Sequence, residues 1–97
     1  MPSSRLFLDL IMDQLSGLNG ITSRKMMGEY ILYCNGKIIG GIYDNRFLLK
    51  PSKTAVSMMP EAVFEKPYEG ARDMLLVEDI DDREFLESLV TAVYNEI

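Results

Sequence analysis

Apolar residues near the start of the chain recur at the spacing of one helical face. They alternate with charged residues such as Asp9 and Asp13, which fall on the opposite side of a 3.6-residue repeat. The spacing predicts an amphipathic helix that Ser3 or Ser4 caps and that ends before Gly17 to Gly20. Its buried face is expected to consist of Phe7, Leu8, Ile11, Met12, Leu15 and Leu18. Leu6 and Leu10 lie at the flank, where we expect partial cover by a neighbouring loop, with a dimer contact as the alternative.

The pattern changes to a period of two between Ile21 and Pro51, with β-branched and aromatic residues between turn signals. Asn35-Gly36 is a strong hairpin signal, and Asp44-Asn45 turns the chain again. The expected strands are Thr22 to Met27, Tyr30 to Cys34, Lys37 to Tyr43 and Arg46 to Lys50. They predict an antiparallel meander of three or four strands. The adjacent glycines at 40 and 41 indicate a bulge or a close backbone approach inside one of them.

The second half of the chain predicts one more strand and a closing helix. Residues 53–59 are expected to form one or two helical turns, the stretch up to Gly70 is less regular, and residues 74–78 are expected to form a fifth strand. Asp81 is the expected N-cap of the final helix, with Glu84 completing a capping box. The predicted fold is therefore α+β: an N-terminal helix, an antiparallel sheet of about four to five strands and a C-terminal helix packed on the sheet, in a single domain spanning residues 1–97.

Composition narrows the chemistry available to this domain. The 97 residues are 47% hydrophobic and contain no histidine and a single cysteine, Cys34. The commonest general base and the commonest zinc ligand are therefore missing, and an internal disulfide is impossible. We expect no catalytic residues, no cofactor and no metal, a cytoplasmic location, and neither a signal peptide nor a membrane span in Met1 to Leu18. Cys34 is expected to be unreactive, and Met27 is expected to be the more buried residue of the pair Met26-Met27.

The net charge of -5 is unevenly distributed along the chain. Residues 22–53 hold six basic and two acidic side chains, whereas residues 54–97 hold three basic and eleven acidic ones. Arg46 and Lys50 project from the same face of one predicted strand, and Lys37, near the opposite hairpin, is expected to join them. Arg24 and Lys25 point to opposite faces of another strand, so at most one of them belongs to the same surface. The candidate partner-binding residues are Arg24, Lys25, Lys37, Arg46 and Lys50. The alternatives are an ordinary solvated face or pairing with the acidic third of the chain.

The run from Ile21 to Tyr30 contains the pattern Arg-Lys-Met-x-Gly-x-Tyr, which begins at Arg24. With Ile31-Leu32-Tyr33, Gly36-Lys37, Asp44, Arg46 and Lys50-Pro51, it resembles the N-terminal domain of the TfoX/Sxy family of competence regulators. The resemblance extends over essentially the whole chain, and Met27 stands where the family often has Phe. It implies an α+β fold without agreed catalytic residues. Full-length members carry a second, helical domain, which is absent from this sequence.

The resemblance and the charge pattern together suggest two functional classes. The first is a non-enzymatic regulatory or adaptor domain that binds another protein, with a transcription factor as one candidate. The alternative is direct nucleic-acid binding through a basic sheet face, which the overall negative charge disfavours. We expect no membrane interaction, and a monomer or a homodimer.

Overall fold

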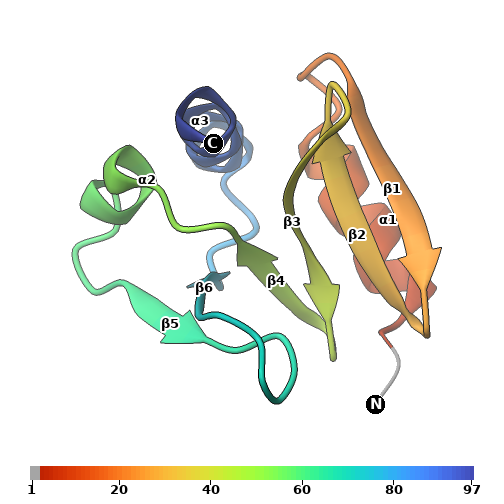
Figure 1. Cartoon of the computed structure of the whole chain (residues 1–97). Coiled ribbons are helices and arrows are strands. Elements are labelled where there is room, and N and C mark those ends of the chain that lie inside the picture. Colours follow the sequence, from red (N-terminus) through yellow and green to blue (C-terminus); the bar gives the residue numbers. More distant parts are fainter. Residues whose placement is uncertain (1–2) are drawn as a thin grey trace.

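The computed structural model describes residues 3–97, which form a six-stranded antiparallel sheet with three helices on one face (Figure 1). The fold is therefore α+β, as the sequence predicts, with one strand more than expected. The elements in chain order are α1 (Arg5–Gln14), β1 (Ile21–Met26), β2 (Glu29–Cys34), β3 (Lys37–Tyr43), β4 (Arg46–Leu49), α2 (Lys53–Ser57), β5 (Val63–Glu65), β6 (Met74–Val77) and α3 (Arg83–Glu96).

The strand order in the sheet is β1-β2-β3-β4-β6-β5. The first four strands form the predicted meander, and their observed limits lie within a residue of the expected ones. β6 is the strand expected at residues 74–78, and it pairs with β4. β5 was not expected, because it is only three residues long and lies in a segment without clear alternation. It pairs with β6 and forms one edge of the sheet, while β1 forms the other.

Tight turns connect the first four strands. Asn35-Gly36 and Asp44-Asn45 form the two predicted turns, and all four residues have positive φ. A third turn of the same kind joins β1 to β2 at Met27-Gly28, with φ of 53° and 84°. Positive φ at both central residues is what a type I′ turn requires, and this turn matches the right-handed twist of the strands. This third turn was not predicted from the sequence, since Met is not a residue typical of it.

One face of the sheet, the inner face, packs against the helices. α1 contributes Leu8 and Ile11 to the core, its C-cap residue Leu15 adds to them, and the middle of α3 contributes Leu86, Leu89, Val90 and Val93. The sheet contributes alternate residues, so that the strands next to the helices have one buried and one less buried side. The fully buried sheet residues of this core are Leu32, Ile39, Ile42, Leu49 and Leu75. The opposite, outer face carries no helix in the described chain (Figure 1).

The adjacent glycines of β3 fulfil the prediction of an irregular strand with close backbone contacts. The register between β2 and β3 shifts after Leu32, leaving Ile39 as the extra residue of a bulge. A Cβ at Gly40 would collide with the backbone of Leu48, and one at Gly41 would lie 2.6 Å from the carbonyl oxygen of Tyr30. These positions therefore require glycine for steric reasons.

The observed N-cap of α1 agrees with the prediction, whereas the observed N-cap of α3 differs from it. Ser4 caps α1 by accepting hydrogen bonds from the amides of Leu6 and Phe7. The N-cap of α3 is Asp82, not Asp81, and its carboxylate accepts from the amide of Phe85 at 3.1 Å. The predicted cap was thus displaced by one residue, and the predicted capping box was wrong, because Phe85 and not Glu84 lies three residues after the cap. Glu84 still lies in the first turn, where the helix dipole favours an acid.

Two further expectations about exposure were wrong. Met27, expected to be buried, is 97% exposed because it occupies the tip of the β1–β2 turn. Leu6 is 80% exposed, so no described loop covers it. None of the helices in residues 3–97 is long and apolar enough to cross a membrane.

Candidate functional site

The outer face of the sheet is covered on one side and open on the other. The segment that joins β5 to β6 crosses over β3 and β4, and its Pro67 is buried. Tyr68 from this segment contacts Tyr43 of β3, with ring centroids 6.3 Å apart. Nothing in the described chain crosses β1 in the same way, and its residues are exposed after the first. The open part of the face is therefore the strip formed by β1, β2 and the near side of β3.

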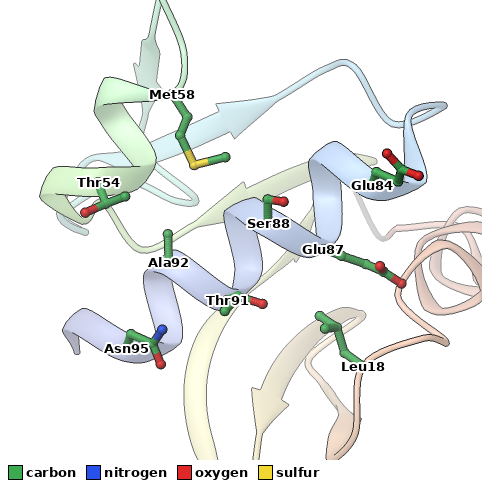
Figure 2. A pocket seen from close by; sticks show the side chains of 9 residues that line it. All are labelled: Leu18, Thr54, Met58, Glu84, Glu87, Ser88, Thr91, Ala92 and Asn95. Atoms are coloured by element: carbon green, nitrogen blue, oxygen red, sulfur yellow. The ribbon is translucent and has the colours of Figure 1, made fainter.

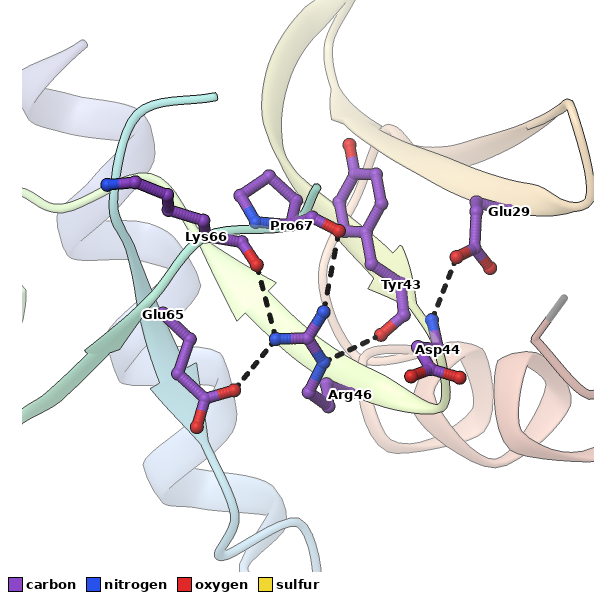
Figure 3. A network of polar contacts seen from close by, with 7 residues as sticks. All are labelled: Glu29, Tyr43, Asp44, Arg46, Glu65, Lys66 and Pro67. Carbon is purple, nitrogen blue, oxygen red and sulfur yellow. Dashed lines mark hydrogen bonds and ion pairs between the residues drawn. The ribbon is translucent and has the colours of Figure 1, made fainter. Parts of the chain in front are cut away.

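Arg46 holds the covering segment against the sheet (Figure 3). Its guanidinium donates to Glu65 Oε1 at 2.7 Å, to the carbonyl oxygen of Lys66 at 3.2 Å and to that of Pro67 at 3.4 Å. Its Nε donates to the carbonyl oxygen of Tyr43 at 3.1 Å. All four acceptors belong to this chain, and the side chain is only 28% exposed. Arg46 thus has a structural role that uses its charge within the fold.

An apolar hollow of about 540 Å³ lies on the open strip of the outer face. The register places Met26, Glu29 and Ile31 on this face together with Tyr43, and Met27 and Tyr68 complete the lining. Because the lining comes from β1, β2, β3 and the covering segment, its shape depends on the tertiary fold.

Glu29 is the acid of the hollow, and its carboxylate is already bonded within the chain. Its Oε1 accepts from the amide and the hydroxyl of Ser3 at 2.9 and 2.6 Å, and its Oε2 accepts from the amide of Asp44 at 2.9 Å (Figure 3). Burial raises the pKa of the Tyr43 hydroxyl, and Tyr68 and Glu29 add to this effect. Tyr43 is therefore neutral near pH 7, and the hollow is suited to an apolar group.

Met27 projects into solvent at the rim of this hollow in a conformation that is unfavourable for its residue type. The left-handed region costs a non-glycine residue about 1 to 2 kcal/mol, and Asn or Asp occupies the equivalent position in the other two turns. A large apolar side chain that is 97% exposed obtains no compensating burial within the described chain. Unfavourable conformations of this kind cluster at functional sites, which makes Met27 the most informative residue of the outer face.

The five basic residues proposed from the sequence do not form one surface. Arg24 and Lys25 point to opposite faces, as expected: Arg24 pairs with Ile31 on the outer face, and Lys25 pairs with Tyr30 on the inner one. Lys50 follows β4 and lines a second hollow, of about 410 Å³, beside Tyr43 and Tyr68. Arg24 is three strands away from β4, or about 14 Å at the usual spacing.

Lys37 was expected to join Arg46 and Lys50, and the structure places it elsewhere. It pairs with Cys34, which faces the core, and its side chain reaches the C-terminal end of α3. There Lys37 Nζ lies 5.0 Å from the ring centre of Tyr94 and donates to the carbonyl oxygen of Ile97 at 3.4 Å. A cation at a helix C-terminus is favourable, so this lysine supports the docking of α3.

A third hollow, of about 640 Å³, lies along α3, with Thr54 and Met58 of α2 on one side of the helix and Leu18 on the other (Figure 2). The remaining lining consists of short side chains of α3 and two acids. These acids, Glu84 and Glu87, give the hollow negative charge. It offers no unsatisfied polar group to a ligand, since residues 3–97 contain no buried side-chain polar atom without a partner.

The described residues contain no cluster of metal-binding side chains, and their cysteine is buried. No group of three or more acids or cysteines in residues 3–97 is arranged to hold a metal ion. Cys34 is 6% exposed, and burial raises the pKa of its thiol, which disfavours the reactive thiolate. This supports the sequence-based interpretation that Cys34 is unreactive.

Comparison with known proteins places the chain in a family. The sequence model described as the TfoX N-terminal domain matches residues 13–96. A protein of Spirochaeta aurantia, described as an uncharacterized 12.7 kDa protein in the trpE 5′ region, is 30% identical over 80 residues. That alignment covers 82% of this chain and 70% of the relative. The match contains all of β1 to β6 and all of α3, and the chain therefore belongs to the TfoX N-terminal domain family.

Proposed function

We propose that this chain is a non-enzymatic regulatory or adaptor domain that binds a protein partner through the open strip of its outer sheet face. The observation that carries the proposal is Met27, which is held at φ 53° and 97% exposed at the rim of an apolar hollow. A partner that covered Met27 would bury it and offset the cost of its backbone conformation. A transcription factor, which the family suggests as a partner, is one candidate.

The chemistry of the hollow fits a protein surface. Methionine side chains are flexible and adapt to varied apolar groups, which is why they are frequent at protein-binding surfaces. Tyr43 and Tyr68 add large, rigid aromatic area of the kind that dominates binding energy at interfaces. Met26, Met27 and Ile31 complete an apolar centre bordered by polar edges, which is the usual anatomy of an interface.

The structure gives direct nucleic-acid binding less support than the excess of basic residues between positions 22 and 53 does. A basic face would need several free cations at phosphate spacing on one surface. Arg46 is bonded within the fold, Lys37 lies against α3, and Lys25 is on the other side of the sheet. The outer face keeps Arg24 and Lys50, whose strands, β1 and β4, are about 14 Å apart across the sheet.

Capture of partners from an extract of the cells that produce this protein tests the proposal. Tagged wild type is compared with Met27→Asn, which removes the apolar side chain and puts an amide suited to this turn in its place. Leu6→Gln is the matched control, because it removes another highly exposed apolar residue, 80% exposed, from α1 and away from the hollow. All captures are performed with and without nuclease.

We expect a protein that wild type and Leu6→Gln retain, that Met27→Asn loses, and that nuclease treatment does not release. Met27→Asn should also raise the melting temperature, because it relieves the unfavourable conformation of Met27. A partner retained equally by Met27→Asn would contradict the assignment to this surface. Release of the partner by nuclease would favour the nucleic-acid alternative.

A further inference from the structure

The edge of the sheet at β1 is unpaired in the described chain. β1 pairs with β2 alone and lies at the end of the strand order, and residues from Thr22 to Met26 are all exposed. The other edge strand, β5, has only three residues, compared with six in β1. β1 is therefore the edge that offers the longer row of backbone donors and acceptors for another strand.

The register shows which residues of β1 direct their backbone groups away from the sheet. The amide of Asn35 donates to the carbonyl oxygen of Gly20 at 2.9 Å, so this pair is of the hydrogen-bonded type. In an antiparallel ladder, hydrogen-bonded and non-hydrogen-bonded pairs alternate. Thr22, Arg24 and Met26 are thus bonded to β2, whereas Ile21, Ser23 and Lys25 present their N–H and C=O groups at the free edge.

Two cations lie along this free edge, one on each face of the sheet. Arg24 points to the outer face and Lys25 to the inner face. Both are exposed, and neither has an ion pair or a side-chain hydrogen bond to any residue from 3 to 97. Glu65 and Asp73, from the acidic third of the chain, form ion pairs with Arg46 and Lys66 and not with these two cations. An incoming strand would therefore meet positive charge on both of its faces.

We propose that the β1 edge binds an acidic, extended peptide segment of the partner, which adds to the sheet as a seventh strand. This inference rests on the proposed function and specifies how the partner is recognised. Backbone groups of Ile21, Ser23 and Lys25 pair with the segment, and acidic side chains on its two faces lie beside Arg24 and Lys25. Main-chain hydrogen bonds supply affinity in this mode, and the side chains supply specificity.

Charge decides between this occupant and a second copy of the chain. Two β1 strands that paired antiparallel around a two-fold axis at Arg24 would set the two copies of Arg24 directly opposite each other, with the two copies of Lys25 nearby. Like charges on neighbouring strands are destabilising, and cationic side chains on an edge are a common protection against such pairing. The same two residues that oppose self-association favour a strand that carries acids.

The edge is continuous with the apolar hollow at its C-terminal end. Met26 is the last residue of β1, it points to the outer face, and it also lines the hollow with Met27. An apolar residue of the incoming strand on the outer face beside Met26 would cover both methionines. The preferred segment therefore combines acids on both faces with an apolar side chain near the turn.

The test uses the full chain and a synthetic peptide of about ten residues, long enough to span β1. The peptide consists of Val, Thr and Glu, with glutamates on both faces. One control peptide has Lys in place of every Glu, and a second carries N-methyl groups on alternate residues, which block strand pairing and keep the charge. Affinity is measured by titration, and amide exchange is followed residue by residue by NMR.

We expect the acidic peptide to slow hydrogen exchange at the amides of Ile21, Ser23 and Lys25. Arg24→Glu with Lys25→Glu should weaken its binding about tenfold, from the loss of two favourable cross-strand pairs and the introduction of like charges. Ser23→Pro, which removes one outward N–H without touching the bonds to β2, should weaken it as well. Ser23→Thr keeps this N–H and is the matched control.

Several results would overturn the inference. They are no binding at millimolar peptide, equal binding of the Lys peptide or the N-methylated peptide, and binding without slower exchange at the three outward amides. Failure here is distinguishable from failure of the proposed function. A partner that depends on Met27 but not on Ser23, Arg24 or Lys25 would leave the outer-face surface in place and exclude strand addition.

Discussion

Arg46 offers the most direct test of how the outer face is built. Arg46→Met removes the guanidinium and keeps most of the aliphatic stem, so that packing against the sheet changes little. The substitution eliminates the ion pair with Glu65 and three hydrogen bonds to the carbonyl oxygens of Tyr43, Lys66 and Pro67. It therefore isolates the contacts that hold the segment between β5 and β6 over β3 and β4 (Figure 3).

The expected cost follows from the exposure of each partner. The pair with Glu65 is partly exposed, at 28% and 37%, and such a pair contributes at most about 1 kcal/mol. Hydrogen bonds from a charged donor contribute about 1.5 to 3 kcal/mol each when buried, and much less at an exposed acceptor such as the carbonyl of Lys66. We expect a total loss of about 2 kcal/mol, which lowers the melting temperature of a domain of this size by about 8 to 16 °C.

Thermal unfolding followed by circular dichroism measures this loss. Lys50→Met is the matched control, since Lys50 is exposed and its side chain has no hydrogen bond within residues 3–97. We expect the control to change stability by less than about 0.5 kcal/mol. If Arg46→Met melts within about 2 °C of wild type, the network does not hold the segment, and the reasoning is refuted.

Three further predictions concern a cap, a carboxylate and a glycine. Asp82→Ala should lower the free energy of unfolding by about 1 kcal/mol in urea titrations, while Asp81→Ala should change it by less than about 0.5 kcal/mol; the reverse order would restore Asp81 as the cap. Hydrogen bonds from the hydroxyl and amide of Thr54, at 2.6 and 2.9 Å, lower the pKa of Glu96. A carboxyl whose folded pKa is below its unfolded value of about 4.3 stabilises the fold above that value and ceases to do so as the pH falls through the folded pKa. In Thr54→Val, the melting temperature should therefore fall less between about pH 6 and pH 3 than it does in wild type. An unchanged pH profile would contradict a role for this contact. Gly40→Ala should destabilise by at least about 2 kcal/mol, because its methyl group would meet the backbone of β4, and a melting temperature within about 4 °C of wild type would contradict the observed approach of the two strands.

Local patterns in the sequence were sufficient to predict the first half of the fold. Alternation and the turn residues Asn35-Gly36 and Asp44-Asn45 depend only on near neighbours, and the strands they predicted are present within a residue of their observed limits. β5 could not be predicted in this way. Its three residues are identified as a strand only by their pairing with β6, which is a contact between separate segments.

The cap of α3 shows a second limit of local rules. Asp81 and Asp82 are adjacent acids, and either one satisfies the residue preference for an N-cap. The backbone decides between them, since Asp82 has extended dihedrals and its carboxylate reaches the amide of Phe85. A choice of this kind depends on the path by which the chain enters the helix.

For the candidate site, the period of two predicted the faces of individual residues better than their surroundings. The opposite directions of Arg24 and Lys25 are confirmed, because they depend only on alternation. The environments of Arg46 and Lys37 depend on a crossing segment and on the end of α3, which alternation does not describe. Met27 was placed wrongly because the turn that exposes it has an unusual residue at its first central position.

The unusual turn residue Met27 also supports the proposed role of the outer face in binding a partner. In the other two turns, Asn35 and Asp44 adopt positive φ with side chains suited to it, and both are polar. At Met27 the chain accepts a less favourable residue that also exposes apolar area to water, and nothing in the described fold benefits from it. Such a conflict between local preference and structure is expected where a residue serves a contact outside the chain. Met27 follows Met26 at the end of the edge strand β1, so the contact at the methionines lies at one end of the free edge. A partner that covered the methionines would therefore already lie alongside this strand.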